Sequence, residues 1–209
     1  YYIADEFKQF ISAARTCAES AQANGNYFEW NYYVFFAIAF YTGMRKGEIH
    51  GLRWSDIDGK YISVKRSISQ KVKGDDRITP PKNKSSIRTL QIPKPLIEIL
   101  NEHKERCKIF DGFSEENYIC GANKPLRDST IQKRNIKFAQ LAGIKTIRIH
   151  DFRHSHASLL ANEGINIQEV ARRLGHSDVE MTWNTYSHLY PREEERAVAV
   201  LDEIILKLE

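Results

Sequence analysis

Two segments in the C-terminal half of the chain carry side chains that could act together on a phosphate group. His150 and Arg153 are at positions i and i+3 of a segment with a helical pattern, so both side chains project from one face of that helix. Arginine offers a planar fork of donors that matches two phosphate oxygens, and histidine can donate a hydrogen bond or move a proton near neutral pH. A second histidine, His176, follows a helix that ends at glycine, and Tyr186 comes ten residues later. These residue types indicate a site that attacks a phosphodiester.

A tyrosine could be the nucleophile of such a site if other groups assist it. The pKa of a free phenol is about 10, so Tyr186 needs a partner that takes its proton. The transition state gathers negative charge on the non-bridging oxygens, which two arginines and two histidines can stabilise without a metal ion. The second arginine is Arg45, at the start of a predicted helix whose backbone N–H groups also favour an anion. The leaving 5′-oxygen needs a proton from a general acid, and Lys82 or Lys84 in a predicted hairpin turn fits that role.

The chain resembles the tyrosine recombinases, also called the phage integrase family, in four segments that occur in the family's order. The similarity is greatest to integrases of phages and conjugative transposons of Gram-positive bacteria, and it extends over about residues 1–190. Each segment alone is a weak pattern, whereas the four in order are specific. The segments are TGMRKGEI (Thr42–Ile49), TPPKNKSSIRTL (Thr79–Leu90), HDFRHSHAS (His150–Ser158) and LGHSDVEMTWNTY (Leu174–Tyr186).

The resemblance assigns a role to one residue after another. It implies that Arg45 is the first catalytic arginine and that Glu48 is the acid that supports it. Further along the chain, His150 and Arg153 match the H-x-x-R motif, His176 matches the position that holds His or Trp, and Tyr186 matches the nucleophile. The general acid is a lysine in the hairpin turn, for which Lys82 is favoured over Lys84.

The family also implies a reaction and its partners. Its members cleave one DNA strand at a time, form a 3′-phosphotyrosine, free a 5′-hydroxyl and exchange strands through a Holliday junction, with no metal, ATP or other cofactor. The outcome is integration or excision of a mobile element. We therefore expect double-stranded DNA attachment sites as the substrate, a homo-tetramer on two such sites, and accessory proteins that set directionality or bend DNA. The expected location is the bacterial cytoplasm, at the nucleoid when bound to DNA, without membrane contact.

Two rival functions use the same residues. A type IB topoisomerase shares the chemistry but relaxes supercoils without exchanging strands. A DNA-binding module could retain the fold without catalysis. The four segments and a C-terminal tail that could dock on a neighbour favour the recombinase over the topoisomerase, and the presence of all the expected polar groups favours it over the non-catalytic module.

The distribution of charge is compatible with a polyanionic partner. The formal net charge is +4, but residues 191–209 carry −3, so residues 1–190 carry +7. Residues 129–153 hold six basic side chains against one acid, Asp151. A solvated cationic face would have the same composition, and Arg172 and Arg173 could contact DNA phosphates or simply face water.

The bulk composition bounds the class of protein. With 209 residues, 42% of them apolar, the chain suits one large domain or two small ones. No apolar run reaches the ~18 residues of a membrane span. The chain has no pattern of a signal peptide and begins within an amphipathic helical pattern, as a fragment of a longer protein would. Its three widely spaced cysteines predict neither a disulfide framework nor a zinc cluster.

The expected fold is mainly helical with one small three-stranded antiparallel sheet, an α+β fold. Alternating patterns predict the strands at Tyr61–Val64, Arg77–Pro80 and Arg88–Ile92, and Ser129 and Asp178 are expected N-caps. Gly43, Gly143, Gly164 and Gly175 are expected helix stops. The expected helices cover residues 3–18, 32–42, 46–50, 95–109, 129–142, 150–163, 166–174, 178–186 and 193–208.

Two parts are expected within this chain. Residues 1–190 form the catalytic domain, and the core-binding and arm-binding domains that usually precede it in the family are expected to be absent. Residues 191–209 form a helical tail that docks on a neighbouring protomer or packs back on its own domain. Its apolar stripe consists of Ala197, Val200, Leu201, Ile204, Ile205 and Leu208.

The other histidines and one tryptophan have structural interpretations. His150 and His154 are four residues apart, but no acidic third ligand lies at a known spacing, so we expect no metal site. His154 is expected to pack or form hydrogen bonds, and Trp183 to anchor the nucleophile's helix in the core. The same structural roles are expected for His50 and His156, and surface positions for His103 and His188.

Overall fold

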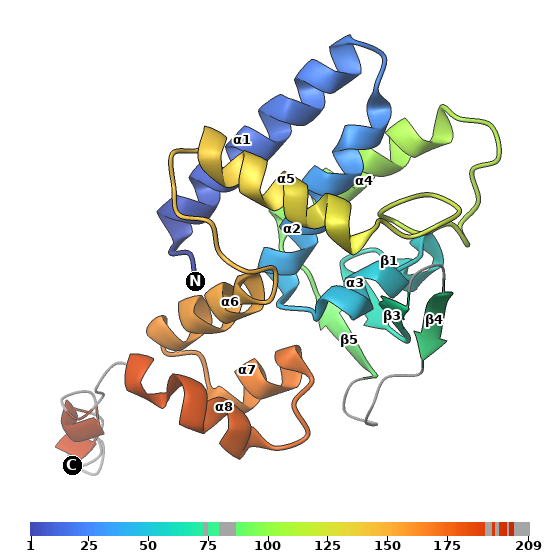
Figure 1. Cartoon of the computed structure of the whole chain (residues 1–209). Helices are drawn as coiled ribbons and strands as arrows, with labels where there is room; N and C mark the ends of the chain where they lie inside the picture. The colour runs from blue at the N-terminus through green and yellow to red at the C-terminus, as the bar shows by residue number, and fades with distance from the viewer. Residues whose placement is uncertain (73–74, 80–86, 191–193, 195–196, 200, 203–209) are drawn as a thin grey trace.

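The chain folds into a mainly helical body with two small antiparallel sheets. The structure is a computed structural model that describes residues 1–72, 75–79, 87–190, 194, 197–199 and 201–202. Figure 1 shows α1, α2, α4 and α5 grouped together, the sheets beside α3, and α6–α8 below them. The helices are α1 (Ala4–Ala23), α2 (Trp30–Thr42), α3 (Lys46–Gly51), α4 (Lys94–Lys108), α5 (Asp128–Leu141), α6 (Asp151–Asn162), α7 (Ile167–Leu174) and α8 (Val179–Tyr186).

Helix α2 lies at the centre of the helical part because its side chains are apolar on every side. A helix of this kind is stable only when neighbours cover its whole circumference. Helices α1, α4 and α6 pack around it, and Val34, Phe35 and Ile38 are completely buried. The predicted buried helix over residues 32–42 is therefore confirmed.

Four aromatic rings join four helices and fix α6 against α2. Phe10 of α1 lies 5.0 Å from Phe36 of α2 and 5.2 Å from Phe152 of α6, measured between ring centroids. Phe138 of α5 completes the group, 5.9 Å from Phe36. Because Phe152 immediately precedes Arg153, this packing also sets the position of that guanidinium relative to the end of α2.

The three C-terminal helices enclose a small core of their own. Ala157 and Ala161 of α6, Val170 and Leu174 of α7, and Tyr186 of α8 are buried together. Apolar side chains one helical turn apart on α6 and on α7 supply this core. The nucleophile predicted from the sequence is thus part of the packing that joins α8 to α6.

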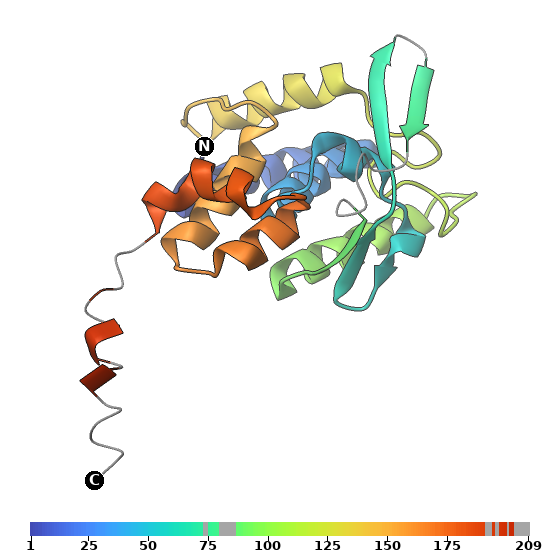
Figure 2. The same ribbon diagram turned by 90° about the horizontal axis from the view of Figure 1, so that it is seen from below.

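The β-structure differs from the single sheet predicted. Strands β1 (Ile57–Asp58), β2 (Tyr61–Val64) and β5 (Arg88–Gln91) form a three-stranded antiparallel sheet in the order β1-β2-β5. Strands β3 (Ser67–Val72) and β4 (Asp75–Thr79) form a separate two-stranded hairpin. Figure 2 shows this hairpin projecting from the body.

The assignment of Arg77–Pro80 to the three-stranded sheet was therefore wrong. Strand β4 pairs with its neighbour along the chain, with Ile68 opposite Ile78, and the short β1 takes the third place in the sheet. A tight hairpin between consecutive strands forms with little loss of chain entropy, which favours this pairing over a longer connection. Pro80 lies outside the described residues.

The predicted helices are confirmed over residues 1–190, with shifts at their ends. Helix α1 continues to Ala23, five residues beyond its expected end, and α5 begins at Asp128, so Ser129 is not its N-cap. Asp178 does cap α8, because its carboxylate accepts a hydrogen bond from the Glu180 N–H. Gly43 and Gly175 end their helices in the left-handed conformation, as expected.

Nothing in the described part of the chain is a helix both long and apolar enough to cross a membrane. Most of the predicted tail helix, and with it Val200, Ile204, Ile205 and Leu208, lies outside the described residues. Its docking partner stays a prediction.

Candidate active site

The turn after α2 brings Arg45 to the edge of the helical body. Gly43 ends α2 with a φ of 64°, and a Cβ at this residue would lie 2.6 Å from Cδ2 of His156. Glycine is therefore required both by the left-handed backbone and by the close approach of α6. Arg45 then occupies the N-cap position of α3, where its backbone N–H donates to the Glu48 carboxylate over 2.9 Å.

A buried carboxylate, that of Glu48, links two arginines. Glu48 is only 2% exposed, and its Oε1 accepts hydrogen bonds from Nη1 of Arg45 at 3.0 Å and from Nη1 of Arg88 at 3.2 Å. Its Oε2 accepts from Nη2 of Arg88 at 3.0 Å. Burial alone would raise the pKa of Glu48, but the hydrogen bonds and charge of Arg88 and the Arg45 N–H outweigh burial and lower this pKa. The predicted support of Arg45 by Glu48 is thus present in the geometry, with Arg88 as a further partner.

Arg153 lies in the same cluster and donates two hydrogen bonds. Its Nη1 donates to the Gly43 carbonyl at 2.8 Å, and its Nη2 donates to Nε2 of His176, also at 2.8 Å. Since arginine has no acceptor, this His176 nitrogen must be unprotonated, and the ring proton is on Nδ1, which donates to Oγ1 of Thr182 at 2.7 Å. The cluster thereby ties the start of α8 to α6 and to the end of α2.

The cluster has more positive than negative charge. Among the residues that the structure describes, three guanidinium groups, those of Arg45, Arg88 and Arg153, surround the carboxylate of Glu48. Burial, followed by the charge of Arg45, lowers the pKa of Arg153 to about 9, so this group is still charged at neutral pH. Burial and the charge of Arg153 lower the pKa of His176 to about 4. An anion at this place would relieve the repulsion, and the half-exposed side chain of Arg45 leaves an approach from solvent.

Tyr186 reaches the cluster from α8 and contacts a histidine that the sequence did not single out. Its hydroxyl lies 2.6 Å from Nδ1 of His154, and its side chain is only 4% exposed. Burial raises the pKa of the Tyr186 phenol to about 12, an effect that the charge of Arg153 opposes. The phenol is therefore neutral at pH 7 and needs an acceptor for its proton before it can attack.

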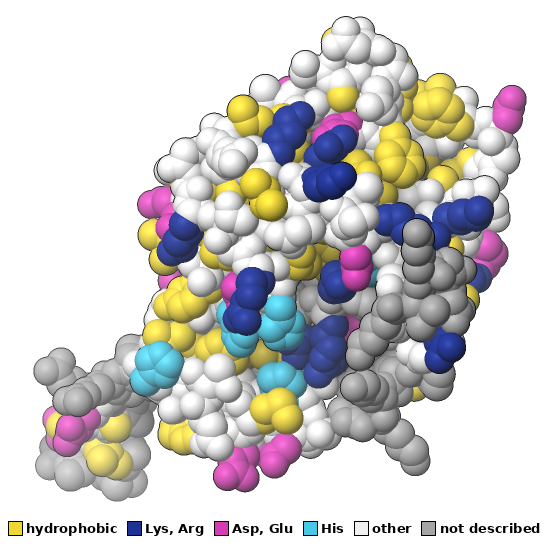
Figure 3. All heavy atoms as spheres, in the orientation of Figure 1, with side chains coloured by type: hydrophobic (Ala, Val, Ile, Leu, Met, Phe, Trp, Pro, Cys, Tyr) yellow, Lys and Arg dark blue, Asp and Glu magenta, His cyan; other side chains and the backbone are white. Residues whose placement is uncertain are grey.

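His150 is at the solvent side of this pair. It is the N-cap residue of α6, its ring is 5.1 Å from that of His154, and the residue is exposed. Burial of the imidazole and the neighbouring His154 both lower its pKa. Figure 3 shows histidine side chains next to Lys and Arg side chains in a hollow of this face, between the three C-terminal helices and the rest of the molecule.

The structure thus brings together five of the six residues predicted to be catalytic, Arg45, His150, Arg153, His176 and Tyr186. The sixth, Lys82, lies outside the described residues, as does its alternative Lys84. Their roles stay predictions.

The two arginines predicted to contact DNA lie in different environments. Arg172 is exposed at 54% of its side chain and pairs with Glu169 on its own helix. Arg173 is half-buried, and its guanidinium donates to the carbonyls of Gln91 and Tyr41. Arg172 therefore remains available to a phosphate, whereas Arg173 connects α7 to the sheet and to α2.

Sequence analysis gave Arg88 no role, and it expected His154 to pack or form hydrogen bonds, which is confirmed, without identifying Tyr186 as its partner. Arg88 alternates with exposed neighbours along β5 and is 8% exposed, in phase with the buried Leu90. An arginine on the buried side of a strand signals a buried ion pair, so this residue could have been found. His154 follows Arg153 directly, but its partner Tyr186 is 32 residues away, and no spacing rule predicts that contact.

Two expectations about side-chain exposure were wrong. Trp183 is 53% exposed, because Thr182 and Tyr186, four residues apart, form the buried face of α8. His103 is 2% exposed instead of on the surface, since it continues the buried stripe of Leu96 and Leu100 on α4. Its Nε2 donates to the Ile119 carbonyl at 2.8 Å.

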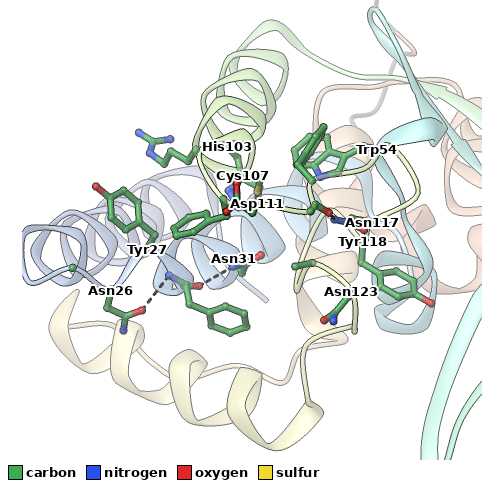
Figure 4. A pocket seen from close by; sticks show the side chains of 17 residues that line it. Asn26, Tyr27, Asn31, Trp54, His103, Cys107, Asp111, Asn117, Tyr118 and Asn123 are labelled. Atoms are coloured by element: carbon green, nitrogen blue, oxygen red, sulfur yellow. Dashed lines mark hydrogen bonds between the residues drawn. The ribbon is translucent and has the colours of Figure 1, made fainter.

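A cavity of about 600 Å³ lies elsewhere in the molecule (Figure 4). The connection between α1 and α2, with Asn26 and Tyr27, forms one wall, and Trp54 and His103 contribute to the others. None of the predicted site residues that the structure describes lines it. The described residues suited to phosphate chemistry therefore lie outside this cavity.

The comparison with known protein families identifies the family of this chain. The sequence model described as "Phage integrase family" matches residues 3–193. The chain belongs to the phage integrase family. The resemblance noted in its four sequence segments is thus confirmed.

Curated relatives in the family include integrases of mobile elements. The chain is 36% identical over 180 residues to the ICEBs1 integrase of Bacillus subtilis (strain 168), which covers 82% of this chain and 49% of the relative. It is 33% identical over 193 residues to a "Tyrosine recombinase XerC-like" protein of Caldanaerobacter subterraneus subsp. tengcongensis, again covering 82% and 49%. The chain therefore spans about half the length of these relatives.

Solved structures in the family share the fold. The Tn1549 transposon integrase in complex with transposon right end DNA superposes with a TM-score of 0.71 at 21% identity, covering 98% of this chain and 65% of that one. The catalytic domain of bacteriophage HP1 integrase superposes with a TM-score of 0.60 at 20% identity, covering 95% and 93%. At these identities the likeness shows the fold, which confirms the predicted fold class.

Proposed function

We propose that the chain is the catalytic domain of a site-specific DNA recombinase that cleaves and rejoins strands through a phosphotyrosine at Tyr186. One observation carries the proposal: Arg45, Arg153 and His176 form a cluster rich in positive charge, and the charge of Arg153 acts on the phenol of Tyr186. The family relationship and the name of the ICEBs1 integrase support the same conclusion.

The proposed step exchanges one phosphodiester for another. The phenolic oxygen of Tyr186 bonds to phosphorus, the bond from phosphorus to the 5′-oxygen breaks, and that oxygen leaves as a hydroxyl after it receives a proton. Lys82 is the proposed donor of this proton, with Lys84 as the alternative. Since one phosphate ester replaces another, the bond energy is conserved and rejoining needs no ATP.

The guanidinium groups of Arg45 and Arg153 stabilise the charge that develops on the non-bridging oxygens, and His176, whose Nε2 accepts a hydrogen bond from Arg153, orients the second of them. Such preorganised donors contribute roughly 3–4 kcal/mol each to the barrier in other enzymes. His150, at the exposed start of α6, would contact the same phosphate from the solvent side.

The substrate and assembly belong to the proposal too. Solved relatives in complex with DNA, among them the Tn1549 transposon integrase, support double-stranded DNA as the partner. We propose attachment sites of a mobile element as the target, a homo-tetramer as the active assembly, and accessory proteins that bend DNA or set directionality. The proposed location is the cytoplasm, at the nucleoid.

Covalent trapping tests the function. A nicked suicide substrate, from which the short cleaved strand diffuses away, should accumulate a protein–DNA adduct whose mapped residue is Tyr186. The matched control is Tyr186→Phe, which keeps the ring that packs in the α6–α8 core and removes only the hydroxyl. It should bind DNA as the unaltered chain does but form no adduct. An adduct that persists in Tyr186→Phe contradicts the assignment of the nucleophile.

A further inference from the structure

The hydroxyl of Tyr186 forms its hydrogen bond with His154, and this pairing has a defined direction. The oxygen and Nδ1 are 2.6 Å apart, and the two rings are tilted by 50° with centroids 5.9 Å apart. Of two neutral groups the phenol is the stronger acid, so the hydroxyl donates and the imidazole nitrogen accepts. The ring proton of His154 is then on Nε2.

We propose that His154 is the proton acceptor that activates Tyr186 for attack on the phosphate. The inference rests on the proposed function, since it concerns the nucleophile of that reaction. It assigns a catalytic role to a residue outside the set that the sequence motifs single out.

The step balances as follows. The phenolic oxygen forms its bond to phosphorus while its proton passes to Nδ1 of His154, and the electron pair of the breaking P–O bond goes to the 5′-oxygen. That oxygen takes a proton from the general acid, so one proton enters at His154 and another leaves at the donor. In rejoining, the 5′-hydroxyl attacks phosphorus and gives its proton back to the deprotonated general acid, while the bond from phosphorus to the phenolic oxygen breaks and the imidazolium returns its proton to that oxygen.

The groups around His154 suit a base that is neutral before the reaction and positively charged after it accepts the proton of Tyr186. Burial, the largest influence, lowers the pKa of His154, so its imidazole is neutral near pH 7 and has one nitrogen that can accept a proton. The carboxylate of Asp151, one turn earlier on α6, opposes that effect and stabilises the imidazolium once it forms. The charged and titratable groups that face the imidazole are Arg148, His150, Asp151 and Arg153 on α6 and the turn before it, Tyr186 on α8, and the α-amino group of Tyr1.

The other histidines of the cluster are engaged differently. Nε2 of His176 accepts from Arg153, and its Nδ1 donates to Thr182, so neither nitrogen is free to take a proton from the phenol. His156 is buried and bonds the Phe40 carbonyl through Nδ1. Among the histidines of the described chain, His154 alone has a hydrogen bond to the Tyr186 hydroxyl.

Two substitutions separate proton transfer from mere positioning. His154→Phe keeps the ring volume without an acceptor, and His154→Asn places an amide oxygen near Nδ1, which accepts a hydrogen bond but is too weak a base to take the proton. Both should reduce the rate of adduct formation on the suicide substrate by at least ~10², with DNA affinity unchanged. Recovery of the full rate in His154→Asn, or a rate within about threefold of the unaltered chain in both variants, overturns the inference.

The leaving group offers a second, independent readout. A substrate with sulfur in place of the bridging 5′-oxygen needs no proton on its leaving group, because a thiolate departs readily. This substrate should restore cleavage in a variant that lacks the general acid, such as Lys82→Ala, and should leave the His154→Phe defect in place. Restoration of His154→Phe would mean that the residue serves the leaving group, which contradicts the proposal.

The tautomer can be measured without any cleavage. Nitrogen NMR of the 209-residue chain should find His154 protonated on Nε2 alone at neutral pH, and its pKa should rise in Tyr186→Phe, where the donor to Nδ1 is lost. A proton on Nδ1 overturns the inference even if the chain cleaves DNA. An unaltered chain that forms no adduct instead contradicts the proposed function itself, and the proton-acceptor role with it.

Discussion

The Glu48 carboxylate and the Arg88 guanidinium form a paired ion bridge in which both partners are nearly completely buried. Nη1 and Nη2 of Arg88 donate to Oε1 and Oε2 of Glu48, and the two side chains are 5% and 3% exposed. The pair connects β5 to α3, and through the bond from Arg88 Nε to the Arg173 carbonyl, at 2.7 Å, it also connects them to α7. It therefore fixes the sheet against both helices that border the site.

Removing one partner of this bridge should be costly for stability. Arg88→Met retains most of the side-chain volume but removes the two hydrogen bonds that Arg88 donates to the buried Glu48 carboxylate, which keeps its hydrogen bond from the Arg45 side chain and the more distant charge of Arg153. We expect the free energy of unfolding, measured by urea titration at pH 7, to fall by about 3–5 kcal/mol. The control is Arg172→Met, which breaks the exposed pair with Glu169 and should cost at most about 1 kcal/mol. Equal losses in the two variants would show that the buried bridge does not hold the sheet in place.

Local sequence patterns predicted which segments form helices and strands better than they predicted which residues contact one another in the fold. The apolar run of α2 and the glycine stops define helices within a few residues, because periodicity and backbone conformation are local properties. The pairing of Arg88 with Glu48 spans 40 residues, and an arginine can bond any nearby carboxylate, so residue type does not identify the partner. The exposure of Trp183, by contrast, was predictable from the sequence. Thr182 and Tyr186 are four residues apart and form the buried face of α8, so Trp183 lies on the outer face.

The sequence predicted which residues form the candidate site better than it predicted the hydrogen bonds between them. Three of the four motifs located Arg45, Arg153, His176 and Tyr186, which come together as expected. The contact of Tyr186 with His154 depends on how α8 packs against α6, a tertiary property that no local spacing encodes.

Acid should weaken the fold through Asp128, which accepts hydrogen bonds from His50, at 2.9 Å, and from Lys46. Burial would raise the pKa of Asp128, but these two partners outweigh it and lower the pKa from 3.8 to about 2. A lowered pKa means that the folded state favours the ionised form. The contribution is therefore fully present above about pH 4 and is lost as the pH falls toward 2.

The measurement compares the unaltered chain with Asp128→Asn. The difference in their free energies of unfolding should be constant between pH 7 and about 4.5 and should shrink below that, as the native carboxylate becomes protonated. Asp58→Asn, at an exposed position, controls for the loss of one negative charge. A difference that grows on acidification would have the wrong sign for a lowered pKa.

DNA binding should weaken steeply with salt, because residues 1–190 carry a formal charge of +7. Each phosphate contact releases counterions and contributes about −0.9 to the slope of log affinity against log salt concentration. Fluorescence anisotropy with a labelled duplex, from 50 to 200 mM salt, would measure that slope. A flat titration contradicts a phosphate-binding surface.

The same titration decides whether Arg172 contacts DNA. Arg172→Gln should reduce the steepness of the slope by about one if its guanidinium contacts a phosphate, and should leave it unchanged if the side chain is only solvated. Glu169→Gln is the matched control, because it frees Arg172 from its intrahelical partner and should strengthen binding in the first case alone.

Arg45 and Arg153 should differ in what their loss does to the protein, although both are proposed to contact the phosphate. Arg45 has a side chain that is 40% exposed, whereas Arg153 is 4% exposed and holds both the Gly43 carbonyl and the His176 imidazole. Replacing either with alanine should slow adduct formation by at least ~10². Only Arg153→Ala should also lower the free energy of unfolding substantially, since it leaves the buried Gly43 carbonyl unpaired, at about 1–3 kcal/mol, and removes the partner of the partly buried His176 nitrogen. Rates measured at saturating DNA, with urea titrations of the same samples, separate the two effects. A rate near that of the unaltered chain in Arg45→Ala, with the fold intact, would remove this exposed guanidinium from the proposed site.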